Sequence, residues 1–149
     1  MKKKYITWSD IESMTKQLIT QMELSNFRPD IVWGLVRGGC VPAILISQHY
    51  DIPMHTWHVS TRDHQTLEPA DADWDVDFST KKCLIVDDIN DSGATINRCQ
   101  LTTEPFINVK YAVLQHKETS KAKIDYYAEH IDKSKCNEWI VYPWEEWSK

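Results

Sequence analysis

Glycine is scarce in this sequence. The chain has 4 glycines among 149 residues, whereas globular proteins usually contain about 7%. Glycine can adopt a positive φ and lets a ligand approach the backbone closely. With so few glycines, there are few places in this chain where a positive φ or such a close approach can occur. Gly34, Gly38 and Gly39 lie within six residues of one another, and Gly93 stands alone. We therefore expect these two regions to carry function.

Long hydrophobic runs are also absent. No stretch reaches the length of about 18 apolar residues that a membrane-spanning helix needs. The first six residues include Lys2, Lys3 and Lys4 and are not followed by the apolar core of a signal peptide. The sequence therefore predicts a cytoplasmic protein that does not insert into a membrane.

An excess of positive charge is missing too. Lysine and arginine total 17 against 22 aspartates and glutamates, which gives a formal net charge of −5. A polyanion is held by a positive field that this chain lacks. Nucleic acid is therefore not expected as a partner.

The cysteines show no metal-binding spacing. Cys40, Cys83, Cys99 and Cys136 are far apart and form no CxxC or Cys/His pattern, which argues against zinc. Buried free thiols in a reducing compartment are the simpler interpretation.

What the sequence does contain is an alternation of apolar strands and amphipathic helices. Apolar residues recur with a period near 3.6 between residues 9 and 24, and Ser9 with Glu12 resembles a capping box. The alternation predicts an α/β fold with a mostly parallel, twisted sheet flanked by helices. The expected strands are 31–36, 54–59, 82–86, 111–114 and, more weakly, 126–128; two further helices are expected to end near residues 50 and 103.

Residues 60–79 have no periodicity and are rich in acidic residues. An unpatterned stretch of this length inside a compact domain is usually either disorder or a functional lid, and we favour a flexible lid. The chain length and its 42% apolar content fit a single domain over 1–149. The C-terminal segment is 124–149, and its aromatic ending, residues 139–147, is expected to be ordered.

The strongest functional signal is the segment 84–95, Leu-Ile-Val-Asp-Asp-Ile-Asn-Asp-Ser-Gly-Ala-Thr. A buried strand leads into Asp87 and Asp88, and a loop of small and hydroxyl residues then opens a helix. Such a loop presents backbone N–H groups and the positive end of the helix dipole to a phosphate. The acids would repel phosphate, so they are expected to bind sugar hydroxyls or a divalent cation. The simpler alternative is that Asp91 only caps the helix.

This segment resembles the phosphoribosyl pyrophosphate (PRPP) signature of type I phosphoribosyltransferases. The resemblance covers nearly the whole chain and is strongest to the small bacterial xanthine-guanine and hypoxanthine enzymes of purine salvage. It implies a single-domain type I phosphoribosyltransferase fold with a lid and a small C-terminal aromatic hood. Further matches are the opening residues 4–8, the segment 37–42 and the ending 139–144.

The resemblance also implies a role for each part of the PRPP site. Arg37, Gly38 and Gly39 would form the pyrophosphate loop, and in the family the peptide bond entering this arginine is often cis. Asp87 and Asp88 would face the ribose hydroxyls and Mg²⁺, with Asp88 as the metal ligand, partly through water. The 5′-phosphate would be held by Asp91, Ser92, Gly93, Ala94 and Thr95.

For the base, the resemblance implies a 6-oxopurine pocket. Asp91 would be the general base near the purine N7, and Lys117 would donate to the 6-oxo group. Trp139 would stack on the purine, and the backbone of Ile140 would contact its edge. Glu145 matches a position that could support a second Mg²⁺, although a solvated acid is the simpler interpretation there.

The lid departs from the family pattern. Thr61 and Arg62 lie where the lid begins, but relatives usually have a tyrosine in place of Arg62, and residues 66–77 contain no cation. Either Arg62 contacts the pyrophosphate itself or this lid works differently.

The resulting hypothesis is a Mg²⁺-dependent purine phosphoribosyltransferase, which converts hypoxanthine, guanine or xanthine and PRPP to a nucleoside 5′-monophosphate and pyrophosphate. The tryptophans other than Trp139, for which the resemblance implies no role in the pocket, together with the family pattern indicate a homodimer or homotetramer. Two alternatives are a regulatory protein that binds PRPP without turnover and a pyrimidine (orotate) phosphoribosyltransferase.

Overall fold

The computed structural model describes residues 1–59 and 80–149. Its helices are α1 (Trp8–Leu24), α2 (Cys40–Tyr50) and α3 (Ala94–Thr103), with a short 3-10 helix at Lys133–Lys135. Its strands are β1 (Lys3–Tyr5), β2 (Ile31–Leu35), β3 (Met54–Trp57), β4 (Cys83–Asn90), β5 (Val109–Lys117), β6 (Tyr126–Ile131) and β7 (Trp139–Val141).

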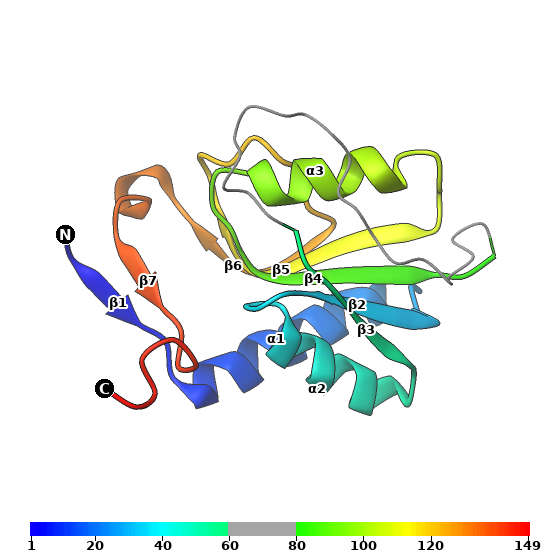
Figure 1. Ribbon diagram of the computed structural model, residues 1–149, viewed down its shortest axis with the longest axis horizontal. Helices are drawn as coiled ribbons and strands as arrows, with labels where there is room; N and C mark the ends of the chain where they lie inside the picture. The colour runs from blue at the N-terminus through cyan, green and yellow to red at the C-terminus, as the bar shows by residue number, and fades with distance from the viewer. Residues whose placement is uncertain (60–79) are drawn as a thin grey trace.

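Five strands form the central sheet in the order β3-β2-β4-β5-β6, and every neighbouring pair is parallel. Helices α1 and α2 cover one face of this sheet, and α3 covers the other (Figure 1). The prediction of a mostly parallel sheet flanked by helices is thus confirmed. Chain order reverses between β2 and β4, which are neighbours in space. In open α/β sheets, ligands bind at such a switch point, beyond the carboxyl ends of the strands.

Alternating side chains of the central strands build two hydrophobic cores. On β4, Leu84 and Val86 pack with residues of α1 and α2, whereas Cys83 and Ile85 pack with residues of α3. All four side chains are fully buried. Strands buried on both faces read as continuous apolar runs, which is why the central strands were recognisable in the sequence.

Several boundaries differ from the predictions: β3 ends at Trp57 rather than at residue 59, β5 spans Val109–Lys117 rather than 111–114, and β6 continues to Ile131. Helix α1 begins one residue earlier, because its capping box is formed by Thr7 and Asp10 rather than by Ser9 and Glu12. Strand β4 does not end at Val86 but continues through the two acids to Asn90. Strand β1 was not predicted.

Strands β1 and β7 pair in parallel with each other and form a separate two-stranded sheet. This small sheet brings the N-terminal residues beside the C-terminal segment (Figure 1). We call it the β1–β7 hood. It places Trp139 and Ile140 on a layer of their own, outside the central sheet.

The cysteines are all free. Cys83 and Cys99 are buried, as predicted, but Cys40 and Cys136 are only partly buried. None of the helices in the described part of the chain is long and apolar enough to cross a membrane.

Candidate active site

Most of the predicted site residues lie at the carboxyl ends of β2, β4 and β5 or on the loops that follow these strands. Because these three strands are adjacent and parallel, their carboxyl ends meet at one edge of the sheet. The edge holds two cavities. The first cavity has a volume of about 500 Å³ and is lined by Arg37, Gly38, Val41, Asp88, Trp144 and Glu145. The second cavity has a volume of about 300 Å³ and is lined by residues 87–96. Asp88 lines both cavities and so connects them.

The loop after β2 presents Arg37 and two glycines. The Val36–Arg37 peptide bond is cis, as the resemblance indicated. Gly39 caps α2 without any side-chain hydrogen bond to the helix N-terminus. A Cβ on Gly38 would lie 2.0 Å from Asp88 Oδ2. The loop after β2 and the acids of β4 are therefore in direct contact.

Asp87 and Asp88 are adjacent acids near the end of β4. The Asp88 N–H donates to Asp87 Oδ1 at 2.9 Å, and the Ile89 N–H donates to Asp88 Oδ1 at 2.7 Å. Burial raises the pKa of Asp88 to about 6, and burial together with the neighbouring charge of Asp88 raises the pKa of Asp87. Within residues 1–59 and 80–149, neither acid forms an ion pair with a lysine or arginine.

The loop 91–93 leads from β4 into α3. Gly93 is at φ +94°, which only glycine adopts without strain, and no side chain caps the helix. A Cβ there would lie 2.7 Å from the backbone nitrogen of Ala122. The Ala94 N–H donates to Ser92 Oγ at 3.3 Å. The result is an open helix N-terminus next to small side chains, which suits an anion such as phosphate.

Lys117, at the end of β5, forms an ion pair with Asp91. Lys117 Nζ lies 2.9 Å from Asp91 Oδ1, and the side chains are 9% and 64% exposed, respectively. A nearly buried ammonium group needs a partner of this kind. The predicted base-reading lysine and the predicted general base are thus neighbours in the structure. The alternative, in which Asp91 only caps α3, is not what the structure has: Gly93 occupies the cap position.

The C-terminal segment contributes unequally. Glu145 lines the cavity with Arg37 and Asp88, and burial raises its pKa. Trp139 is half-exposed and Ile140 is buried, and neither lines the two cavities. The predicted lid over 60–79, with Thr61 and Arg62, lies outside the described residues.

Sequence reasoning missed a buried amide network beneath the loop 91–93. Asn90 Nδ2 donates to the Ala122 carbonyl at 3.1 Å and lies 3.0 Å from His116 Nδ1, and Ser120 Oγ donates to Asn90 Oδ1 at 2.8 Å. Burial lowers the pKa of His116, and the nearby charge of His130 lowers it further. A neutral His116 can accept from Asn90. The network ties the segment 118–122 to Asn90 at the end of β4, directly before the loop 91–93. The sequence signal for it was one polar residue, Asn90, after the apolar Ile89.

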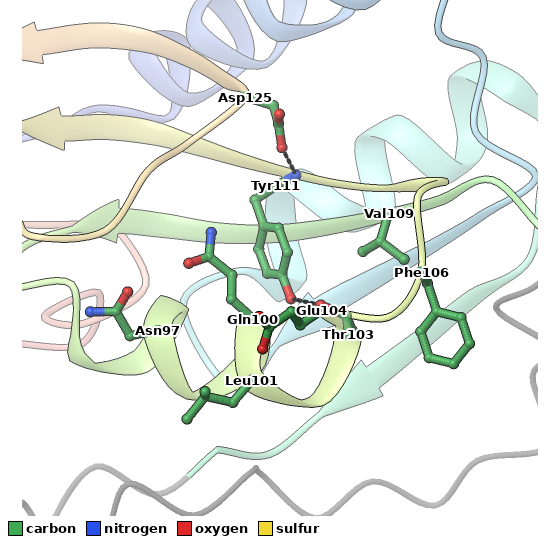
Figure 2. A pocket seen from close by; sticks show the side chains of 9 residues that line it. All are labelled: Asn97, Gln100, Leu101, Thr103, Glu104, Phe106, Val109, Tyr111 and Asp125. Atoms are coloured by element: carbon green, nitrogen blue, oxygen red, sulfur yellow. Dashed lines mark hydrogen bonds between the residues drawn. The ribbon is translucent and has the colours of Figure 1, made fainter.

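A third cavity, of about 590 Å³, lies between α3 and β5 (Figure 2). Asn97, Gln100, Glu104 and Asp125 are among its lining residues. No predicted site residue lines it, and it is formed by α3 and the amino end of β5, away from the carboxyl ends of the strands. It is separate from the candidate site.

Comparison with known proteins agrees with this geometry. The sequence profile of a family described as the phosphoribosyl transferase domain matches residues 6–147. The xanthine-guanine phosphoribosyltransferase of Nitratidesulfovibrio vulgaris is 24% identical over 94% of this chain and 83% of its own length. That of Cereibacter sphaeroides is 25% identical over 95% of this chain and 86% of its own length.

Among solved structures, the purine phosphoribosyltransferase from Pyrococcus horikoshii is similar with a TM-score of 0.78 and 28% identity. The match covers 98% of this chain and 96% of that chain. The parallel sheet, the loops at its carboxyl edge and the profile match over nearly the whole length lead to one conclusion. The chain belongs to the phosphoribosyl transferase domain family and has the type I phosphoribosyltransferase fold.

Proposed function

We propose that this protein transfers the phosphoribosyl group of PRPP to a 6-oxopurine, namely hypoxanthine, guanine or xanthine. A bond forms between a purine nitrogen and C1 of the ribose, and the bond from C1 to the pyrophosphate oxygen breaks. The purine N–H proton goes to a base on the protein. The observation that carries the proposal is the Lys117–Asp91 pair beside the phosphate loop.

The two cavities suit the two ends of PRPP. The loop 91–95 offers an open helix N-terminus for the 5′-phosphate, with Ser92 and Thr95 as hydroxyl donors. Arg37 supplies a permanent cation for the pyrophosphate in the first cavity, which it lines with Asp88, and Gly38 and Gly39 keep the backbone there free of side chains. Asp87 and Asp88 lie between the two ends, where the ribose hydroxyls would be.

For the base, Lys117 would donate to the 6-oxo group, which adenine replaces with an amine. Asp91 would accept the purine proton as the new bond forms, which is the role of a general base. The 2.9 Å ion pair must then open to admit the purine between the two side chains. Trp139 is half-exposed and available for stacking, and Ile140 follows it on β7.

The acidic residues fit a magnesium site. Burial raises the pKa of a carboxyl group when no cation is near it. The pKa values of Asp87 and Asp88 are both raised in this way. Across the two described segments, no group of three His, Cys, Asp or Glu side chains could hold a metal alone. Mg²⁺ is commonly held by one or two carboxylates together with substrate phosphates and water. Asp88, with Glu145 across the same cavity, would hold it, and the ion would neutralise charge on the departing pyrophosphate.

Several features of the proposal rest on the sequence patterns and on the resemblance. These are a lid over 60–79 that begins with Thr61 and Arg62 and excludes water from PRPP, a single domain over 1–149 with a C-terminal segment at 124–149, a homodimer or homotetramer, and a cytoplasmic location. A regulatory protein that binds PRPP without turnover would have no need for Lys117 beside Asp91. An orotate phosphoribosyltransferase would not use a lysine that donates to a purine 6-oxo group.

Replacing Lys117 with alanine tests how the base is read. We expect kcat/KM for hypoxanthine or guanine to fall by about 10- to 100-fold, because a charged hydrogen bond to the 6-oxo group is lost. PRPP binding, measured by calorimetry, should change little. Lys110→Ala is the matched control, since Lys110 lies on the same strand and also pairs with an aspartate, Asp125, at 3.8 Å. Equal losses of base use and PRPP binding would remove Lys117 from the base-reading role.

A second prediction concerns pH and stability without metal. The folded-state pKa of Asp88, about 6, lies above its ordinary value of 3.8. Protonated Asp88 therefore favours the folded state, and this stabilisation is lost as pH rises from about 4 through 6. In chelator, Asp88→Asn should melt progressively higher than the natural protein as pH increases from 4 to 7.5. A melting-temperature difference that stays constant over this range would contradict the buried-acid account.

A further inference from the structure

A buried tyrosine links the hood to the acids of the central sheet. Tyr142 directly follows β7 and is 1% exposed. Its hydroxyl donates to Gln115 Oε1 at 2.6 Å and lies 3.4 Å from the backbone carbonyl oxygen of Asp88. Gln115 is on β5, two residues before Lys117. One hydroxyl group thus contacts the strand of the acids and the strand of the lysine.

The ring of Tyr142 extends the same link to the first cavity. It stacks on Trp144 with ring centroids 5.1 Å apart and planes 3° from parallel. Trp144 lines the cavity that also contains Arg37 and Asp88. The hood and the central sheet are separate sheets, so this contact fixes one against the other. A second cross-link, the 2.9 Å ion pair of Lys4 with Glu129, is exposed to solvent and so contributes less.

The hydrogen bonds of this pair are unevenly satisfied. A tyrosine hydroxyl has one proton, yet two acceptor oxygens lie within 3.4 Å of it. Meanwhile Gln115 Nε2 is buried and has no hydrogen-bond partner among the described residues. A half-turn of the amide would let Nε2 donate to the Tyr142 oxygen. The hydroxyl proton would then be available to the Asp88 carbonyl.

The position of Asp88 leaves little room for error. Its carboxylate fills the space where a Cβ of Gly38 would be and borders both cavities. A small shift of its backbone would therefore move the carboxylate relative to Arg37 and to the loop 91–95. Misplacing a reacting group by about 1 Å can cost about 100-fold in rate.

We propose that Tyr142 and Gln115 are positioning residues: with the Gln115 amide turned so that Nε2 donates to the Tyr142 oxygen, the Tyr142 hydroxyl donates to the Asp88 carbonyl and holds the Asp88 backbone where its carboxylate can serve PRPP. This inference rests on the proposed function, because it assumes that Asp88 faces PRPP. Neither side chain touches the substrate itself. Their effect is transmitted through Asp88.

The test compares two tyrosine-to-phenylalanine changes. Tyr142→Phe removes the hydroxyl and keeps the ring, and Gln115→Met removes the amide at similar volume. Tyr111→Phe is the matched control: Tyr111 is also buried, and its hydroxyl lies 2.6 Å from the Thr103 hydroxyl on the α3 side of the sheet (Figure 2). For each variant, melting temperature, calorimetric binding of PRPP with Mg²⁺, and kcat and KM with a 6-oxopurine are measured.

We expect Tyr142→Phe to weaken PRPP binding or lower kcat by about ten-fold, and Gln115→Met to have the same kind of effect. The double variant should lose no more than Tyr142→Phe alone, because the two groups act as a unit. Tyr111→Phe should lower the melting temperature to a similar degree but leave PRPP binding and kinetics within about two-fold.

Equal kinetic effects of Tyr142→Phe and Tyr111→Phe would overturn the proposal, as would a change in melting temperature alone. If Tyr142→Phe does not fold, Gln115→Met decides by the same criteria. If the unsubstituted protein binds PRPP but does not turn it over, the proposed reaction is refuted. PRPP binding by the variants would still decide this inference. A protein that binds no PRPP would refute both.

Discussion

Replacing Asp91 with asparagine is expected to reduce turnover of a 6-oxopurine by about 100-fold at neutral pH, the usual scale for a lost general base. PRPP binding should persist, because the backbone of the loop 91–93 and the N-terminus of α3 are unchanged. Asparagine keeps the size of the side chain but cannot accept the purine proton. Steady-state kinetics with saturating PRPP and calorimetry with PRPP alone separate the two effects.

The loss of the ion pair with Lys117 needs its own control, since Asp91→Asn leaves a nearly buried ammonium group without its partner. Asp125→Asn breaks a second Asp–Lys pair, with Lys110, which lies at the amino ends of β5 and β6, away from the carboxyl edge of the sheet. It should leave turnover unchanged. Unaltered turnover in Asp91→Asn would remove the general-base assignment. Parallel losses of PRPP binding and turnover would instead place Asp91 in the phosphate site only.

The second large effect is expected at the adjacent glycines Gly38 and Gly39, which should separate function from folding. A Cβ on Gly39 would lie 2.1 Å from the backbone oxygen of Val86 and 2.8 Å from the backbone nitrogen of Leu35. Both atoms belong to central strands that cannot move independently. Gly39→Ala should therefore destabilise the fold by about 3 kcal/mol or more, seen as a large drop in melting temperature.

At Gly38, the three atoms nearest to the added methyl group would all belong to the carboxylate of Asp88, a side chain that can rotate away. Gly38→Ala should fold with a melting temperature close to that of the natural protein. PRPP turnover should nevertheless fall by about ten-fold or more, because Asp88 is displaced from its position between the cavities. Full turnover in Gly38→Ala, or a Gly39→Ala variant as stable as the natural protein, would contradict the close contact between the loop after β2 and strand β4.

The central layers of the fold were predictable from the sequence, because parallel strands buried on both faces leave continuous apolar runs. Ile31 to Leu35 and Cys83 to Val86 are such runs, and both are strands of the central sheet. The extension of β4 through Asp87 and Asp88 was not predictable in this way, since two acids end the apolar pattern while the backbone ladder to β5 continues. The pairing of β1 with β7 was also missed, because three-residue strands carry too little pattern.

Many of the residues that the structure brings together at the carboxyl edge of the sheet could be selected from the sequence. Small residues and acids after a buried strand have a direct chemical meaning, so Asp88, Gly93 and their neighbours were identified from sequence. The glycine count was a useful guide: Gly38, Gly39 and Gly93 all lie where a Cβ would collide with a neighbouring loop or strand. Gly34 faces Ala43 of α2, with 3.0 Å between its hypothetical Cβ and the Ala43 Cβ, so this glycine allows close packing of β2 on α2.

Contacts between distant segments could not be predicted. The Tyr142–Gln115 hydrogen bond joins residues 27 positions apart in the chain, and the contact of Tyr142 with Asp88 spans 54. Tyrosine and glutamine carry no local pattern that marks such a pair. Only the packing of the hood against the central sheet brings them together.

The most direct test of the central claim is an assay of PRPP with five bases: hypoxanthine, guanine, xanthine, adenine and orotate. Each is incubated with Mg²⁺ and, separately, with a chelator, and the nucleoside 5′-monophosphate and pyrophosphate are quantified. We expect nucleotide from at least one of the three 6-oxopurines, little from adenine or orotate, and none in chelator. Nucleotide from orotate or adenine only, or from none of the five bases, would contradict the account.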